Sequence, residues 1–194
     1  MRGVRYTSVM KKSHSIILGV VGVLALWLWF GYNGLITGSE SVVASWAQVE
    51  TQYQRRVDLV PNLVSTVKGA ANFEQSTFTA ITEARSRWQT APTRGDRIAA
   101  AGEMEGALAR LLVSVENYPQ LQATQAYRDL MTQLEGTENR IGVARRDYNE
   151  SVRSYNLRVK RFPGNLLAGL FGFGAETFFE AQEGSDVAPK VDFE

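Results

Sequence analysis

The sequence of 194 residues predicts an all-α fold, in which an N-terminal transmembrane helix precedes a long-helix, antiparallel four-helix-type bundle. Three observations predict this fold class. Residues 16–30 form an unbroken apolar run, IILGVVGVLALWLWF. Through most of residues 41–162 the apolar side chains recur at intervals of three and four, as in an α-helix, and not at the interval of two that a half-buried strand needs. The same stretch holds only six glycines, few enough for long helices.

The apolar run is long enough to cross a membrane. Extended to residue 36, it contains about 21 residues, or roughly 31 Å of helix, which matches the hydrocarbon core of a bilayer. Residues 1–15 form a short basic tail before it, and the aromatic rings near its end favour the headgroup layer. We therefore predict a membrane anchor over residues 16–36, with the lipid bilayer as its partner. The side chains expected to face lipid are Ile16, Leu18, Val21, Leu24, Leu26, Trp27, Trp29 and Phe30.

Two other interpretations of this segment compete with an uncleaved anchor. A cleaved signal peptide also has a basic start, but it needs small residues after the apolar stretch, where this chain has WFGYN. A buried helix of a soluble protein would show a polar face, which residues 16–30 lack. Four cations precede the span and none follows it before Arg55. The positive-inside rule therefore predicts a cytoplasmic N-terminus and places residues 41–194 outside, which for the inner membrane of a Gram-negative bacterium, our expected location, means a periplasmic C-terminal domain.

The spacing of apolar residues divides the bundle, residues 41–162, into four expected helices. The first starts near Ser41, and Pro61 should kink it or mark a short break. The second begins with Asn72 as N-cap, and the third runs over residues 96–115. The fourth and longest helix begins after Pro119 and continues for about 40 residues. The expected core includes Trp46, Val49, Tyr53, Val57, Val60, Phe78, Ile81, Trp88, Met104, Leu111, Ile141, Tyr148, Val152 and Tyr155.

Small residues and a change of composition mark two further regions. Gly102 and Gly106 lie four apart on the third helix, and we interpret them as tight packing inside the bundle rather than as an oligomer seam. Residues 163–194 form a tail rich in glycine and phenylalanine. Three positions for this tail stay open: on its own bundle, on a neighbouring subunit, or on the membrane.

The composition excludes most catalytic chemistry. The chain has no cysteine and a single histidine, His14, which removes thiolate chemistry and Ser–His mechanisms in the bundle. Acid pairs such as Glu135 and Glu138 lie among arginines, so we interpret them as a salt-bridged helix face rather than a metal site. The net charge of +1 gives no indication of nucleic-acid binding. We expect no catalytic residue, no metal and no cofactor; a Ser–Lys pair has no motif to support it.

A denser pattern resembles a known family. RRVDLVPNLV at residues 55–64, ENYPQL at residues 116–121 and LEGTENRI at residues 134–141 resemble the signature of the LemA family of membrane-anchored proteins. The likeness covers nearly the whole chain from Gly31 onward. The motif positions that we single out are Arg55, Arg56, Asp58, Pro61, Asn62, Glu74, Tyr118, Pro119, Asn149 and Asn156.

The resemblance implies an N-terminal anchor and a helical domain similar to a four-helix bundle, and it implies no known catalytic activity. Members of the family are associated with membrane stress, with a membrane metalloprotease and, in magnetic bacteria, with organelle membranes. No role for an individual residue follows from this.

We interpret the motif positions as structural. Arg55 or Arg56 is expected to pair with Asp58, or with Glu74 across the kink, and Asn62 to cap backbone groups that Pro61 frees. The two asparagines at 149 and 156, seven apart on one helix face, are expected to satisfy buried polar groups.

The leading functional hypothesis is a non-enzymatic, single-pass scaffold that assembles with itself as a homo-oligomer at the bacterial envelope. The alternative is an adaptor that binds a membrane protease or an envelope-stress partner as a single subunit. An unrecognised hydrolase with a Ser–Lys pair is the third hypothesis, and reactive-serine labelling would test it.

Overall fold

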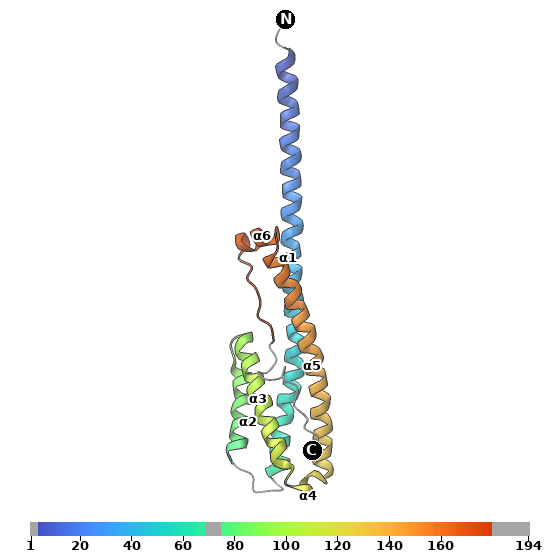
Figure 1. Ribbon diagram of the computed structural model, residues 1–194, viewed down its shortest axis with the longest axis vertical. Coiled ribbons are helices and arrows are strands. Elements are labelled where there is room, and N and C mark those ends of the chain that lie inside the picture. The colour runs from blue at the N-terminus through green and yellow to red at the C-terminus, as the bar shows by residue number, and fades with distance from the viewer. Residues whose placement is uncertain (1–3, 69–74, 180–194) are drawn as a thin grey trace, which may run out of the picture. The chain divides into compact units, whose positions relative to one another are not determined.

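The computed structural model describes the backbone of residues 4–68 and 75–179, and the side chains of residues 16–68 and 75–179 (Figure 1). Every regular element in these residues is helical, with no strand, which confirms the predicted all-α class. The elements are α1 (Val4–Lys68), α2 (Gln75–Thr90), α3 (Arg94–Val115), α4 (Pro119–Gln122), α5 (Gln125–Lys160) and α6 (Gly164–Phe171).

The chain forms two compact units, and each draws on α1 and α5. We name them the anchor unit, which consists of Met1–Val43 and Ser151–Glu176, and the bundle unit, which consists of Ala44–Glu150 and Thr177–Glu194.

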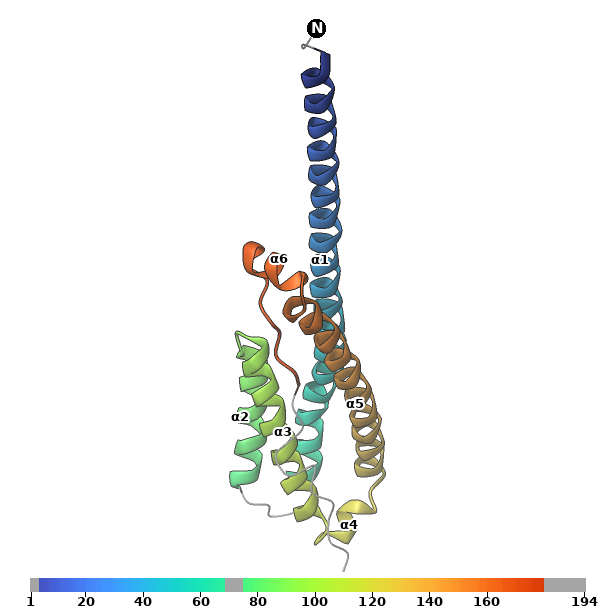
Figure 2. The same cartoon turned by 45° about the horizontal axis from the view of Figure 1, so that its top comes forward.

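The bundle unit buries the side chains that face one another from its helices. α2 and α3 form a helical hairpin, visible in Figures 1 and 2. Thr93 caps the start of α3, because its side-chain oxygen accepts a hydrogen bond of 3.1 Å from the backbone N–H of Asp96. The predicted core is confirmed here; its buried members are Trp46, Val49, Tyr53, Val57, Val60, Phe78, Ile81, Trp88, Met104, Leu111, Ile141 and Tyr148.

The anchor unit has a smaller core and a long uncovered helix. Leu35 is buried against Leu167 and Ala168 of α6, and Tyr155 of α5 approaches α1 at Gly38. Before this contact the described apolar side chains of α1 are exposed, except Trp27, which is half-buried. The most apolar 18-residue window of the helix has a mean hydropathy of 1.9, and none of it is buried. By length and composition α1 can cross a membrane.

The helix boundary predicted near Ser41 is wrong, because α1 runs unbroken from Val4 to Lys68. The surface changes from apolar to mixed near this point, but a change of surface does not interrupt the backbone hydrogen bonds. Thr37 even bonds within the helix, its hydroxyl donating to the Asn33 carbonyl at 2.9 Å. The short break at Pro61 is likewise not found, and the kink stays a prediction.

The predicted longest helix is in fact two helices, α4 and α5, and α1 is longer than both. The chain restarts at Thr124, whose side-chain oxygen accepts from the backbone N–H of Tyr127 at 3.3 Å, as an N-cap does. The predicted tight packing at Gly102 and Gly106 is also wrong. A Cβ added at either position would meet nothing within 4 Å, and both glycines line an open groove beside α2.

Candidate functional sites

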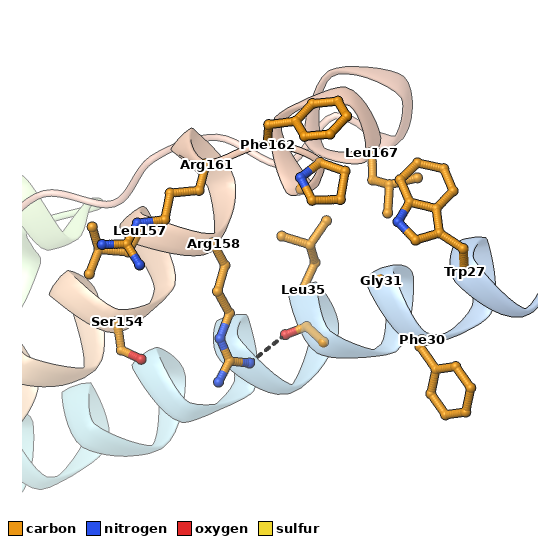
Figure 3. A pocket seen from close by; sticks show the side chains of 13 residues that line it. Trp27, Phe30, Gly31, Leu35, Ser154, Leu157, Arg158, Arg161, Phe162 and Leu167 are labelled. Carbon is orange, nitrogen blue, oxygen red and sulfur yellow. Dashed lines mark hydrogen bonds between the residues drawn. The ribbon is translucent and has the colours of Figure 1, made fainter. Parts of the chain in front are cut away.

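An apolar pocket that contains two arginines lies in the anchor unit. It has a volume of about 510 Å³ and is lined by α1, the end of α5 and the start of α6 (Figure 3). Leu35 and Leu157 contribute apolar surface, and Arg158 and Arg161 contribute charge. Arg158 is held by a hydrogen bond of 2.8 Å from its Nη1 to the carbonyl oxygen of Gly34. We name this the two-arginine pocket.

Two glycines allow α6 to pack closely against its neighbours beside the pocket. A Cβ at Gly31 would overlap the side chain of Leu167, and a Cβ at Gly164 would overlap the backbone carbonyl oxygen of Arg158. At the other end of α6, Gly172 adopts φ 75°, the left-handed conformation that commonly ends a helix. The sequence therefore permits close approach where α6 begins and a sharp exit where it ends.

Aromatic rings fasten the segment after α6 to the anchor helix. The ring of Tyr32 meets that of Phe171 edge-on with centroids 4.9 Å apart, and that of Phe173 with centroids 5.9 Å apart. Such pairs add to the apolar burial at Leu167. Three positions were left open for the tail, and residues 164–173 of it pack on their own chain.

The two motif asparagines each hold the backbone of the C-terminal segment. In the anchor unit, Asn156 Nδ2 donates to the carbonyl of Glu176 and Asn156 Oδ1 accepts from its N–H, both at 2.8 Å. In the bundle unit, Asn149 makes the same reciprocal pair with Phe179, at 2.9 and 2.8 Å. An asparagine amide offers one donor side and one acceptor side, so it can bond a peptide group as a strand would. The polar groups that these asparagines were predicted to satisfy are thus the peptide groups of Glu176 and Phe179.

A cluster of charged side chains lies between α1, α3 and α5 in the bundle unit. The Arg56 side chain, only 5% exposed, pairs with Glu138 and lies 3.6 Å from Glu105. Glu105 also pairs with Arg145 and accepts a hydrogen bond of 2.7 Å from the Tyr53 hydroxyl. We name these five residues the charge cluster. Its two arginines and two glutamates balance in charge; Arg56 is buried and the Glu105 side chain is only 14% exposed, whereas Glu138 is 56% exposed.

Aromatic rings cover the charge cluster. The Arg145 guanidinium lies over the rings of Phe179 and Tyr53, at 4.4 and 5.4 Å from their centroids. Tyr53 in turn lies 4.6 Å from Trp88, between ring centroids. Phe179 thus links the C-terminal segment to the cluster.

The electrostatics of the cluster favour a structural role. Burial, reinforced by the negative charge of Glu105, raises the pKa of Tyr53 far above its ordinary value. Tyr53 is therefore a protonated donor at neutral pH and not a nucleophile. Among the described residues, no group of three or more histidine, cysteine or acidic side chains is arranged to hold a metal ion.

Several predicted pairings differ in the structure. Arg56 pairs with Glu105 and Glu138 and not with Asp58, whose carboxylate instead accepts from Gln54 Nε2 at 2.8 Å. Arg55 points outward and is exposed, because the neighbouring positions of a helix face different directions. Glu74, and the predicted N-cap Asn72, lie outside the described residues.

Other motif positions are found near the helix ends and on the surface. Pro119 occupies the first turn of α4 after Tyr118, as predicted, where its missing N–H leaves no partner unsatisfied. Asn62 is exposed, and its backbone carbonyl accepts from the Ser65 hydroxyl at 2.9 Å. Among the predicted lipid-facing residues Trp27 differs, since it is half-buried against the Leu35 cluster.

Sequence reasoning missed the centre of the charge cluster. Neither Glu105 nor Arg145 was singled out from the sequence, and Glu138 was interpreted only as part of a salt-bridged helix face. Periodicity could have revealed it. Tyr53 and Arg56 lie three residues apart on the apolar side of α1, and an arginine buried on such a face needs a carboxylate partner.

These features define the class of protein. An exposed apolar helix, a helical bundle and a structural charge cluster define a membrane-associated helical protein. The family model described as the LemA family matches residues 45–193, and the chain belongs to this family.

Curated relatives agree with this placement. The chain is 30% identical over 196 residues to magnetosome protein MamQ 2 of Paramagnetospirillum magneticum, covering 88% of this chain and 72% of the relative. It is 28% identical to magnetosome protein MamQ of Magnetospirillum gryphiswaldense, covering 82% and 70%. It is 22% identical to protein LemA of Metamycoplasma hominis, covering 78% and 69%.

Proposed function

We propose that this protein is a non-enzymatic scaffold, held in the bacterial inner membrane by residues 16–36 and working through contacts of its helical units. The observation that carries the proposal is the uncovered apolar surface of α1. Ile16, Leu18 and Phe30 are 67%, 72% and 71% exposed. Such a surface is costly in water and favourable in hydrocarbon, so the segment is a transmembrane anchor.

The proposed topology has a cytoplasmic N-terminus and a periplasmic bundle unit. It is supported by the four cations before the anchor. Because the chain has no cysteine, single-cysteine reporters are unambiguous. Ser8→Cys and Val113→Cys are labelled with a membrane-impermeant maleimide in intact spheroplasts. Labelling at residue 113 alone is expected; labelling at residue 8 alone would reverse the topology.

Self-assembly is the proposed mode of action. It is supported by the open groove at Gly102 and Gly106, where small residues leave room for the close approach of a helix from a second copy. Crosslinking in native membranes, followed by the mass of the detergent-solubilised particle, tests it. Ladders of this chain are expected.

The alternative adaptor function gives a different result in the same experiment. An adaptor of a membrane protease would appear as one copy of this chain with a second protein, and mass spectrometry of the crosslinked band would identify that protein. A particle of one chain with no crosslinked partner would contradict both functions.

A further inference from the structure

The turn after α5 and the outer face of α6 present apolar side chains that the chain does not cover. Phe162, Leu166 and Leu170 are 79%, 57% and 71% exposed, and Phe171 is 50% exposed. The opposite face of α6 buries Leu167 against α1. An eight-residue helix with one apolar face packed and a second apolar face open needs an apolar medium on its open side.

The contacts of α6 with α1 fix its level along the anchor. They are made at Gly31, Tyr32 and Leu35, which belong to the last part of the segment over residues 16–36. From Gly31 to the end of that segment is five residues, or about 7.5 Å of helix. This is the depth of about 5–10 Å at which amphipathic helices lie in the boundary between headgroups and acyl chains.

Positive charge gathers at the same level. Arg158 is bonded to the carbonyl of Gly34, and Arg161, directly after the end of α5, has an exposed side chain. Residues 151–176 contain four cations, and the acidic side chains in residues 16–43 and 151–176 are Glu40 and Glu176. The apolar pocket that contains both arginines thus matches the chemistry of a lipid with an anionic headgroup.

From this arrangement we infer that the anchor unit makes a second membrane contact. α6 lies in the interface with Phe162, Leu166 and Leu170 toward the acyl chains. The two-arginine pocket binds an anionic phospholipid, whose phosphate is held by Arg158 and Arg161 and whose acyl chain lies along the pocket toward Trp27 and Phe30. This inference rests on the proposed anchor.

The depth of α6 is measurable in the full chain. Nitroxide labels are placed singly at Val23→Cys, Leu170→Cys and Val113→Cys in vesicles of phosphatidylcholine and phosphatidylglycerol. These native side chains are 67%, 71% and 62% exposed, so the three sites are matched in exposure. Relaxation by oxygen, which concentrates in lipid, is compared with relaxation by a water-soluble nickel chelate.

We expect lipid-type accessibility at residues 23 and 170 and water-type accessibility at residue 113. Water-type accessibility at residue 170 with lipid-type accessibility at residue 23 overturns the inference and leaves the anchor standing. Water-type accessibility at both residues overturns the anchor, and the inference with it.

The headgroup is tested by native mass spectrometry of the protein released from vesicles of equal phosphatidylcholine and phosphatidylglycerol content. Wild type is expected to retain phosphatidylglycerol with an enrichment of about fivefold or more. The variant Arg158→Gln/Arg161→Gln should lose the enrichment. Arg153→Gln/Lys160→Gln changes the net charge equally outside the pocket and should keep it. Equal retention by both double variants, or no enrichment in wild type, overturns the assignment of the arginines.

Circular dichroism of each variant establishes that the helices are intact. The depth measurement at residue 170 does not depend on the arginine variants, so it tests the membrane contact even where the double variant fails to fold.

Discussion

The two units of this protein place their apolar side chains oppositely, inside in the bundle unit and largely outside in the anchor unit. The bundle unit buries its apolar side chains and closes its buried charges into a cluster, in which Arg56 is 5% exposed beside two glutamates. The anchor unit leaves many large apolar side chains outside: Leu18, Phe30 and Leu170 are 72%, 71% and 71% exposed. Since burial of apolar surface drives folding in water, the inverted pattern indicates a different surrounding medium for the anchor unit.

α1 carries both patterns within one helix. Its first apolar residues have no polar face, whereas Val49, Tyr53, Val57 and Val60 form one buried face at helical spacing. The backbone is the same in both halves, so the medium is set by side-chain pattern alone. This contrast between the units leads to four effects that can be measured.

The largest effect is expected in the charge cluster. Arg56→Ala removes the partner of Glu138 and leaves Glu105, whose side chain is 14% exposed, with one arginine fewer. Breaking a fully buried ion pair costs about 3–5 kcal/mol, but Glu138 is 56% exposed and Glu105 keeps Arg145, so the free energy of unfolding of the full chain in detergent should fall by about 3 kcal/mol, the lower end of that range. Chemical denaturation followed by circular dichroism measures it.

The adjacent arginine supplies the control. Arg55 is exposed, and Arg55→Ala should change the free energy of unfolding by no more than about 0.5 kcal/mol. Equal losses for the two variants would mean that the cluster is no more than a surface network, and that the bundle unit does not depend on closing its buried charges.

The second effect concerns the C-terminal segment of the anchor unit. Asn156→Ala leaves the N–H and the carbonyl of Glu176 without their side-chain partner, at a cost of about 2–3 kcal/mol. Hydrogen exchange of the Glu176 amide should accelerate, because this bond holds the segment to α5. Asn165→Ala, at an exposed position of α6, should leave that exchange rate unchanged. An unchanged rate in both variants would show that other contacts hold the segment.

The sequence predicted those parts of the fold in which apolar side chains recur at regular helical spacing. Helical periodicity is a local signal, and it identified the buried residues of α1, α3 and α5, such as Tyr53, Met104 and Tyr148. It placed a helix boundary at Ser41 wrongly, because the composition changes there while the backbone hydrogen bonds continue. Thr124, whose side chain caps a new helix, was overlooked for the opposite reason: one capping residue is a weak signal inside a strongly periodic stretch.

The candidate sites were less predictable, because they depend on contacts between distant residues. Arg56 and Glu138 are 82 positions apart, and Tyr53 and Glu105 are 52 apart. Which carboxylate meets which arginine follows from how the helices pack, and periodicity does not encode it. The pairing of Arg56 with Asp58, suggested by their closeness in sequence, failed for this reason. The asparagines were recognised as polar groups of one face, but their partners lie in a segment without a periodic pattern.

The third effect tests how closely α6 fits the anchor unit. A Cβ at Gly164 would overlap the carbonyl oxygen of Arg158, and a backbone obstacle cannot rotate away. Gly164→Ala should therefore destabilise the packing of α6 by about 1–3 kcal/mol, seen as faster hydrogen exchange over residues 164–171. Gly169→Ala on the same helix meets nothing within 4 Å and should not accelerate it. If both variants exchange alike, the close approach at Gly164 is not required.

The smallest effect is a pH dependence confined to the bundle unit. Burial raises the pKa of Tyr53 in the folded chain, so the folded state retains this proton above pH 10, where the unfolded chain releases it. The stability that depends on the neutral phenol is therefore complete below about pH 10 and falls above it, by up to about 1.4 kcal/mol per pH unit.

Tyr53→Phe should lower the free energy of unfolding at pH 8 by about 1 kcal/mol, because the bond to Glu105 is lost, and should flatten the decline in this free energy between pH 10 and 11. Tyr127→Phe serves as the comparison, since Tyr127 is half-buried and its pKa is raised less. Denaturation curves at pH 8, 10 and 11 separate the two variants, and an equal decline in wild type and Tyr53→Phe would show that Tyr53 ionises as readily in the folded chain as in the unfolded one.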